Sequence, residues 1–265
     1  DIHICFCGNL TSGWEGVTGG IGGSDKRELR RLSGGGYDDM ETLAIRDFIR
    51  NGKIKGPRLL CSGTPIKVVG GHEPGYDITG PIEARKAVRQ FLFEGVDFIK
   101  TMVTGGLGKV GEDPGAVELE LDELEAIVSE AAKHGKKVAC HCHSKKGMEI
   151  LLKAGAASIE HATYLDPEIN EQIIRQGVYV VPTFTPYEIA AASEVGCGIV
   201  PDAIFASRAM IEDKRRRLKQ AYDQGVLIAF GRDSGGFFMD QGEFAGSSSY
   251  HNTSQSCEGR KDRNP

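Results

Sequence analysis

Residues 136–166, KKVACHCHSKKGMEILLKAGAASIEHATYLD, contain two short apolar segments separated by an amphipathic one. The apolar segments at 136–142 and 158–164 predict strands, because they are short and bounded by polar or glycine residues. The intervening segment at 147–156 predicts a helix that ends in glycine-containing sequence. This order is typical of a βα unit in a parallel sheet, whose strands are buried on both faces.

The same alternation extends along most of the chain, from about residue 57 to residue 233. Further strands are predicted at 57–63, 96–102, 178–184 and 226–233, and further helices at 82–95 and 121–135. Six such strands, with DIHIC at 1–5 as a candidate for an earlier one, favour an α/β fold of the (β/α)8 TIM-barrel type over an open sheet. A barrel of this type needs eight strands, and the sequence offers about seven.

Two regions interrupt the pattern. Residues 8–36 include ten glycines and predict irregular structure, so that strand two of the barrel is expected to be absent. Residues 236–265 are polar and aperiodic, and we expect a loop or a disordered tail there. The expected organisation is one barrel domain over 1–235, incomplete at strand two and at the C-terminal helix, followed by this tail.

Composition narrows the class of protein. A net charge of -5 gives no electrostatic reason to expect nucleic acid, and the basic stretch KRRRLK at 214–219 predicts a solvated helix face. No apolar run approaches the length that spans a bilayer, and the first residues do not resemble a signal peptide, so no membrane partner is expected. Seven cysteines without regular spacing do not indicate a disulfide framework. We therefore expect a cytoplasmic protein.

Ionisable side chains occur at or near the predicted C-terminal ends of successive strands: His3, Lys100, His141, His143, His161 and Asp233. Each alone has a structural explanation, such as a hydrogen-bonded core histidine, an aspartate at a turn or a lysine whose stem is buried. The C-terminal ends of barrel strands meet at one mouth, where active sites are built. Imidazole and carboxylate groups gathered there predict a metal site suited to zinc-like ions.

Several stretches resemble the amidohydrolase superfamily of metal-dependent hydrolases, from about residue 37 to residue 235. They are GPRLLCSG, GGHEPG, GVDFIKTMVTGG, the stretch at 136–166, GVYVVPTFTPY and LIAFGRDSG, in the order and spacing of the family. The sequence is most similar to the branch of imidazolonepropionase-like proteins, Xaa-Pro dipeptidases and zinc carboxypeptidases.

The resemblance implies a set of site residues. Lys100 corresponds to the strand-four lysine that is carboxylated, and whose carbamate bridges two divalent metal ions, expected here to be zinc. His141 and His161 match the histidine ligands of the second metal. Asp233 matches the aspartate that binds the first metal and acts as the general base. The implied reaction is attack of a metal-bound hydroxide on an amide carbonyl, which cleaves the C–N bond of a peptide or N-acyl amino acid.

The resemblance also implies candidate substrate-binding residues. His143 shares a strand face with His141. It could be a metal ligand, a group that supports a ligand or a substrate contact, and we favour the last two roles. Tyr187 and His72 lie in segments that reach the mouth in relatives, although either also fits an ordinary loop position. Arg232 stands beside Asp233, where relatives usually have a small threonine.

Other departures from the family lie near the N-terminus. The strand-one signature is H-x-H, but this chain reads His3-Ile4-Cys5, so a cysteine replaces one ligand histidine of the first metal and a single-metal site becomes an alternative. The usual strand-two sequence, the last helix and the segments of the small β-sandwich domain are not found. We therefore expect a truncated or altered reading of a longer gene.

Three functions stay open at this stage. The first is an active hydrolase for a small-molecule or dipeptide-like substrate. The second is a non-catalytic, degenerate amidohydrolase-like fragment that cannot hold both metals. The third is a lactonase or phosphotriesterase that uses the same metal site, since substrate choice on this scaffold depends on its loops. An incomplete barrel leaves strand edges exposed, so a homo-oligomer is also possible.

Overall fold

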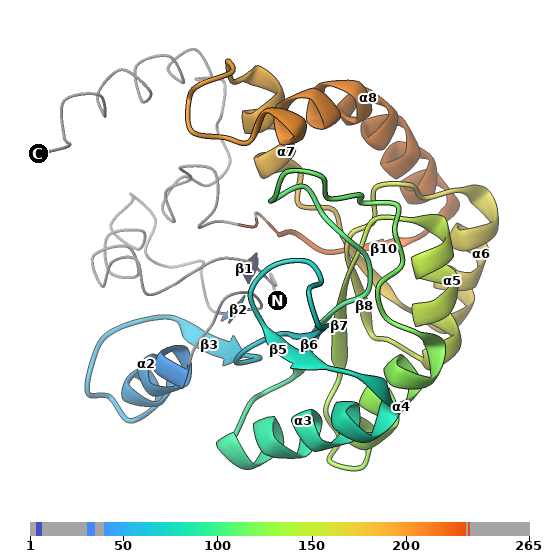
Figure 1. Cartoon of the computed structure of the whole chain (residues 1–265). Coiled ribbons are helices and arrows are strands. Elements are labelled where there is room, and N and C mark those ends of the chain that lie inside the picture. The colour runs from blue at the N-terminus through green and yellow to red at the C-terminus, as the bar shows by residue number, and fades with distance from the viewer. Residues whose placement is uncertain (1–3, 7–30, 35–39, 232, 234–265) are drawn as a thin grey trace, which may run out of the picture.

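The computed structural model describes residues 4–6, 31–34, 40–231 and 233, and these form one set of parallel strands with helices outside it (Figure 1). The strands are β1 (Ile4–Phe6), β2 (Arg31–Gly34), β3 (Arg58–Cys61), β4 (Ile66–Val68), β5 (Tyr76–Ile78), β6 (Ile99–Met102), β7 (Val138–Cys142), β8 (Ser158–His161), β9 (Tyr179–Val181) and β10 (Leu227–Ile228). The helices are α2 (Met40–Arg50), α3 (Gly80–Glu94), α4 (Leu121–Ala132), α5 (Lys145–Ala154), α6 (Pro167–Gln176), α7 (Phe184–Ala192) and α8 (Pro201–Gln224).

All strand pairings between these named strands are parallel. One sheet has the order β1-β2-β3, and the other has the order β10-β9-β8-β7-β6-β4-β5. A hydrogen bond from the Asp97 amide to the Cys61 carbonyl, 2.8 Å long, joins the end of β3 to the chain entering β6. The series β1, β2, β3, β6, β7, β8, β9 and β10 therefore follows the strand order of a (β/α)8 barrel, with β4 and β5 as an addition beside β6.

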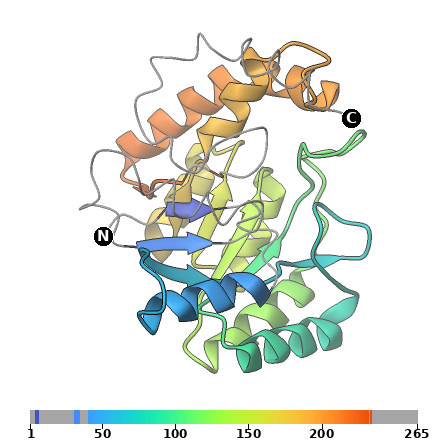
Figure 2. The ribbon, with the colours of Figure 1, turned by 90° about the vertical axis from the view of Figure 1, so that its left-hand side faces the viewer.

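Helices α3 to α8 form an arc around the outside of the strands (Figure 1), and the side view places α2 beside β3 (Figure 2). Their boundaries have local causes. Ser144 and Asp166 cap the N-termini of α5 and α6 by accepting hydrogen bonds from backbone amides three residues later. Gly155 and Gly177 end the same helices with φ of 85° and 65°, a left-handed conformation that glycine adopts without a Cβ penalty. Each helix thereby returns the chain promptly to the next strand.

The core lies between the strands and the inner helix faces. Every residue of β7 is buried, including its two cysteines and His141, which agrees with a strand covered on both faces. Ile99 of β6 and Ile159 of β8 are fully buried beside it. The central strands are thus rigidly packed, and the side chains at their C-terminal ends have fixed positions.

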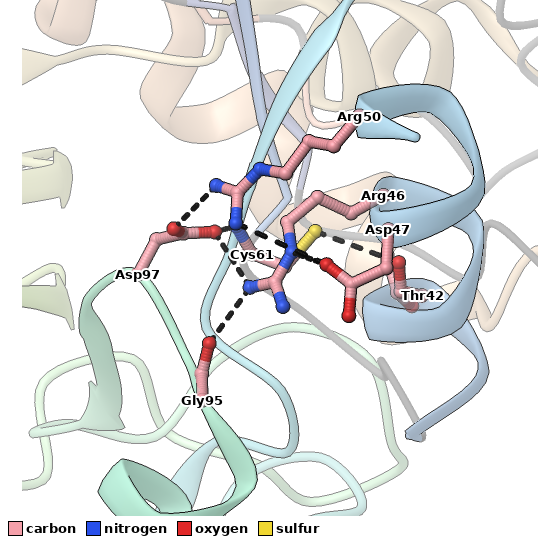
Figure 3. A network of polar contacts seen from close by, with 7 residues as sticks. All are labelled: Thr42, Arg46, Asp47, Arg50, Cys61, Gly95 and Asp97. Atoms are coloured by element: carbon pink, nitrogen blue, oxygen red, sulfur yellow. Dashed lines mark hydrogen bonds and ion pairs between the residues drawn. The ribbon is translucent and has the colours of Figure 1, made fainter. Parts of the chain in front are cut away.

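A network of polar contacts connects α2 and β3 to the start of β6 (Figure 3). Arg46, whose side chain is 4% exposed, donates to the Gly95 carbonyl at 2.8 Å and to Asp97 at 2.9 Å. Asp97 also accepts from Arg50 at 2.7 Å and from the Cys61 amide at 2.9 Å. This single carboxylate therefore joins α2, the end of β3 and the segment that leads into β6.

The structure confirms the α/β class and the predicted strands from β3 onward, although each strand is shorter than its predicted segment. It differs from the prediction at strand two. Residues 31–34 form β2, which pairs with β1 on one side and β3 on the other, inside the region that was expected to be irregular. The local sequence, RLSG, does not predict a strand, but hydrogen bonds to a neighbouring strand on each side stabilise one.

The remaining expectations concern additional strands, the C-terminal tail and membrane-spanning helices. β4 and β5 are additional strands that the sequence did not predict, because a lysine and an aspartate interrupt their apolar residues. The predicted tail at 236–265 and the expected absence of a last helix lie outside the described residues. None of the helices described above combines the length and apolar character needed to cross a membrane.

Candidate metal centre at the strand C-termini

Three histidines meet at the C-terminal ends of β7 and β8. His141 lies in β7, His143 follows that strand, and His161 ends β8. Their ring centroids are 4.5 to 5.0 Å apart, and their potential ligand atoms all lie within 4.8 Å of one another. Two nitrogen ligands of one tetrahedral zinc ion lie about 3.4 Å apart, so the three side chains would move closer together to share an ion.

Each of the three imidazoles contacts an oxygen that orients it. His143 Nδ1 lies 2.8 Å from Thr163 Oγ1, and His161 Nδ1 lies 2.6 Å from Thr183 Oγ1. His141 Nε2 lies 3.2 Å from the carbonyl oxygen of Gly105. The threonine contacts engage Nδ1 of two rings and leave their Nε2 atoms for another partner, which is how the other ring nitrogen of a metal-binding histidine is commonly held.

Burial keeps these imidazoles in the neutral form that binds metal. All three are at most 4% exposed. Desolvation lowers the pKa of each ring well below its ordinary value, and neighbouring positive charges, including Lys100 in every case, lower it further. A neutral imidazole retains the lone pair that coordinates a cation. The donor set and its protonation state therefore fit a divalent metal.

The backbone at this mouth is strained. Five described non-glycine residues have positive φ: Glu73 at 62°, His161 at 71°, Ala162 at 45°, Thr183 at 44° and Asp233 at 60°. Four of them lie at or beyond the C-terminal ends of β8, β9 and β10, and the fifth follows His72. Left-handed conformations cost on the order of 1–3 kcal/mol each in non-glycine residues and cluster at functional sites. The concentration here indicates a functional region.

Lys100 and Asp233 lie near the trio from two other strands. Lys100, in β6, is only 1% exposed, and its charge acts on all three imidazoles. Asp233 follows β10, and its Oδ2 lies 4.0 Å from His161 Nδ1. The arrangement brings a lysine, three imidazoles and a carboxylate to one mouth.

His72 extends over the same site from the loop between β4 and β5. Its ring centroid is 4.3 Å from that of His141, and its Nδ1 lies 2.8 Å from Glu112 Oε1. A Cβ on Gly106 would lie 2.1 Å from the His72 ring, so only glycine at that position allows the ring to pack against the loop after β6. The position of His72 is therefore set by the loop that contains Gly105 and Gly106 and by Glu112.

Glu73 adds a group that titrates near neutrality. Burial raises its pKa to about 7, and the carboxylates of Glu112 and Asp233 contribute in the same direction. The influence of Asp233 places this loop within electrostatic reach of the residue that follows β10. The mouth thus contains a carboxyl group that can gain or lose a proton at physiological pH.

Residues 37–257 match the Amidohydrolase family. The match covers most of the chain. The chain belongs to the amidohydrolase family.

Individual relatives agree with this assignment. The chain is 29% identical to ochratoxinase from Aspergillus niger over 273 residues, which cover 88% of this chain and 56% of that protein. Its fold is similar to the crystal structure of a Xaa-Pro dipeptidase with bound methionine in the active site, with a TM-score of 0.78, 29% identity and coverage of 91% and 66% of the two chains. A putative prolidase from Bifidobacterium longum gives a TM-score of 0.74 at 27% identity, over 91% and 60% of the chains. The chain thus spans little more than half the length of its curated amidohydrolase relative.

The structure brings most of the sequence-predicted residues of this amidohydrolase together. His141, His161 and Asp233 lie near, at or beyond the C-terminal ends of their strands, and Lys100, the second residue of β6, lies close to them. Tyr187, in α7, is buried, and its ring is 6.0 Å from His143 and 6.1 Å from His161. His143 was expected to contact substrate, but the structure groups it with His141 and His161 as a third potential ligand.

Other predicted positions are not placed. His3 and Arg232 lie outside the described residues. Cys5 lies in β1 by its backbone, whereas its side chain is outside the described part of the structure.

Sequence reasoning missed Lys214. The stretch at 214–219 was predicted to be a solvated helix face, and this prediction is wrong for its first residue. Lys214 is only 2% exposed, whereas Arg215, Arg216 and Lys219 are exposed. The signal that was available is helical spacing, since Lys214 follows Met210 and Ile211 by four and three residues on the apolar side of α8.

Proposed function

We propose that this chain is a metal-dependent hydrolase that cleaves the C–N bond of an amide in a dipeptide or an N-acyl amino acid. The observation that carries the proposal is the buried cluster of neutral His141, His143 and His161 at the strand C-termini. A mononuclear or binuclear centre there is consistent with membership of the amidohydrolase family.

His141 and His161 would hold one ion, with His143 as an additional ligand or substrate contact. Lys100 is proposed to take part as a carbamate, since carboxylation converts a buried ammonium into an anion that matches the surrounding imidazoles and a cation. A bound divalent ion, for which zinc is the proposed identity, would activate a water molecule and polarise the amide carbonyl.

The chain's own residues supply the proton transfer and the positioning. Asp233, beside His161, is proposed as the general base that accepts a proton from the attacking water and passes it to the leaving nitrogen. Tyr187, in α7, borders the trio, and Tyr187 and His143 would contact the substrate. Thr163 and Thr183 fix the imidazoles in the orientation that this chemistry needs.

The substrate class rests on the names of similar proteins together with the site. A Xaa-Pro dipeptidase and a putative prolidase are among the structures that this fold resembles at more than 25% identity. The proposed substrates are therefore Xaa-Pro dipeptides and N-acyl amino acids with a free carboxylate.

The test combines metal analysis with an activity screen. Purified protein would be loaded with zinc, cobalt or manganese, analysed for bound metal, and assayed on a panel of Xaa-Pro dipeptides and N-acyl amino acids. We expect one or two equivalents of metal and hydrolysis that His161→Ala abolishes. His134→Ala, which removes an exposed histidine, is the matched control and should change neither quantity.

A second candidate function is a non-catalytic amidohydrolase-like protein. The observation that favours it is the cysteine at position 5, in β1, where the family has a ligand histidine. In the same experiment, no hydrolysis of any substrate in the panel, with one equivalent of bound metal or none, would favour this candidate, whereas hydrolysis by the metal-loaded protein would contradict it.

A further inference from the structure

Helix α8 carries a lysine in a position built for an apolar side chain. The buried residues of the helix recur at helical spacing: Ala203, Ile204, Ser207, Met210, Ile211, Lys214 and Ala221. Met210 and Ile211 pack with Tyr187 in a small hydrophobic cluster, and Lys214 continues their row by one turn. A leucine or methionine would complete this row without burying a charge.

The Lys214 ammonium has an aromatic contact but no hydrogen-bond acceptor. Its Nζ lies 3.9 Å from the centroid of the Tyr187 ring and 5.2 Å from that of Phe184. Among the described residues, no atom accepts a hydrogen bond from Nζ, although the side chain is 2% exposed. Burying an ammonium group without acceptors is costly, and the aromatic faces offset only part of that cost. We therefore expect a bound ligand to supply the hydrogen-bond acceptor for Lys214 Nζ.

Tyr187 places this ammonium beside the histidine cluster. The Tyr187 ring meets His143 and His161 edge to face, at interplanar angles of 90° and 86°, while Lys214 Nζ lies over the ring itself. The charge of Lys214 adds to the effect of burial in lowering the pKa of both histidines. Burial also lowers the pKa of Lys214 well below its ordinary value, against the opposing influence of Asp233, and a carboxylate bound beside Nζ would favour its charged form. Lys214 is thus within electrostatic reach of the residues proposed to carry the reaction.

We propose that Lys214 binds the free carboxylate of the substrate and makes the site selective for C-terminal acids. The inference rests on the proposed function, because it assigns a partner to the leaving amino acid of that reaction. A carboxylate supplies the acceptor oxygens that Nζ lacks, and a charge-assisted hydrogen bond in a desolvated site is stronger than a neutral one. Tyr187 holds the ammonium at the edge of the histidine cluster, so that the bound acid lies next to the scissile bond.

Binding measurements test the inference without requiring turnover. The probes are L-methionine and L-methioninamide, added to the metal-loaded protein and measured by titration calorimetry. We expect the acid to bind wild type about 10- to 100-fold more tightly than the amide, the range that one charge-assisted hydrogen bond provides. Lys214→Met should abolish this difference, and Lys214→Arg should retain part of it.

Matched variants separate substrate binding from a structural role. Methionine fits the apolar row of α8, so Lys214→Met should unfold at the same temperature as wild type or higher, and should keep its metal. Lys219→Met changes an exposed lysine on the same helix that pairs with Asp223, and it should leave the preference for the acid intact. An equal affinity of wild type for acid and amide, or a preference that survives in Lys214→Met, overturns the inference.

Kinetics distinguish failure of this inference from failure of the proposed function. L-Alanyl-L-proline and L-alanyl-L-prolinamide would be assayed in parallel with metal-loaded wild type and Lys214→Met. We expect wild type to favour the free acid through KM, and Lys214→Met to lose that advantage with little change in kcat. Equal hydrolysis of both compounds by wild type overturns the role of Lys214 and leaves the hydrolase standing. Hydrolysis of neither, together with equal binding of the two methionine probes, overturns both.

Discussion

At the scale of single residues, Thr183 shows how the site is held. It lies just beyond β9 in a left-handed conformation with φ of 44°, and its hydroxyl lies 2.6 Å from His161 Nδ1. The strained backbone thus places one oxygen against one ring nitrogen. Because an orienting partner fixes both the tautomer and the direction of a ligand imidazole, its loss weakens metal binding without removing a ligand.

Thr183→Val tests this orienting contact. Valine has nearly the same shape as threonine but no hydroxyl, so we expect the affinity for zinc to fall about 10-fold or more. Competition with a chromophoric chelator measures this affinity. Thr101→Val is the matched control, because Thr101 is equally buried but its hydroxyl donates to the Ile66 carbonyl, away from the histidines. An unchanged affinity in Thr183→Val would show that the contact does not orient a ligand.

Lys100→Ala tests the proposed carbamate. Removing the side chain should lower the bound metal and abolish any hydrolase activity, because the proposed bridging anion is lost. Short carboxylic acids such as acetate should restore part of both, since they supply a carboxylate in the space that the truncation opens. Metal analysis by atomic emission, with and without acetate, measures the effect. A variant with full metal content would contradict the bridging role of Lys100.

The site residues that could be predicted from the sequence are placed by strand topology, whereas those that were missed are placed by tertiary packing. Lys100, His141 and His161 lie in neighbouring apolar strands, the histidines near the C-terminal ends, so their proximity follows from the topology of a βα barrel. Lys214 was missed because a run of five basic residues in six suggests solvent, and only the packing of α7 against α8 buries the first of them. The position of His72 depends on a close approach to Gly106, which no local pattern reveals.

At the scale of elements, the attachment of α2 depends on Asp97. Burial alone would raise the pKa of Asp97, but hydrogen bonds from the Cys61 amide, Arg50 and Arg46 outweigh it and hold the pKa below its ordinary value. The folded state therefore binds this proton less readily than the unfolded state. The resulting stabilisation is complete above the unfolded pKa of about 4 and is lost as the pH falls through the lower, folded pKa.

Asp97→Asn should lower the free energy of unfolding by about 3 kcal/mol at neutral pH, because it removes a carboxylate that pairs with both the buried Arg46 and Arg50. The difference from wild type should shrink in acid, as the wild-type carboxylate becomes protonated. Urea unfolding at a series of pH values measures both effects. Asp47→Asn alters a half-exposed partner of the same arginine and should cost less than about 1 kcal/mol. Equal effects of the two substitutions would contradict the central role of Asp97.

The continuity of an apolar run determined whether the sequence revealed a strand. β7 has five residues, all buried, and its apolar run was sufficient to predict it. β9 and β10 have only three and two residues, but they lie within the apolar runs VYVV and VLIAF. The sequences of β2, β4 and β5 (RLSG, IKV and YDI) contain no such run, so their existence is decided by the neighbouring strands that supply hydrogen bonds.

At the scale of the whole molecule, a bound metal should contribute strongly to stability. Among the described strands, no pairing joins β10 to β1. An ion held by His141, His143 and His161 would add a link between the ends of β7 and β8. A ligand at 1,000 times its Kd stabilises a protein by about 4 kcal/mol. For a chain of this size we expect the metal-loaded protein to melt about 8–16 °C above the chelated one.

Differential scanning fluorimetry with EDTA and with added zinc measures this shift. His161→Ala should melt at one temperature under both conditions, since it lacks a ligand, whereas the control His134→Ala should keep the wild-type shift. An identical melting temperature for metal-loaded and chelated wild type would contradict the metal centre.

The order in which the strands pair has a consequence for folding during synthesis on the ribosome. β6, β7, β8, β9 and β10 pair in chain order, so each emerging strand finds its neighbour already made. The three imidazoles are complete once β8 has docked, whereas Asp233 follows β10, after the long helix α8. A nascent chain thus offers a cation its nitrogen ligands well before the carboxylate is synthesised. In the proposed hydrolase, the histidines could therefore bind the metal ion before the general base Asp233 is present.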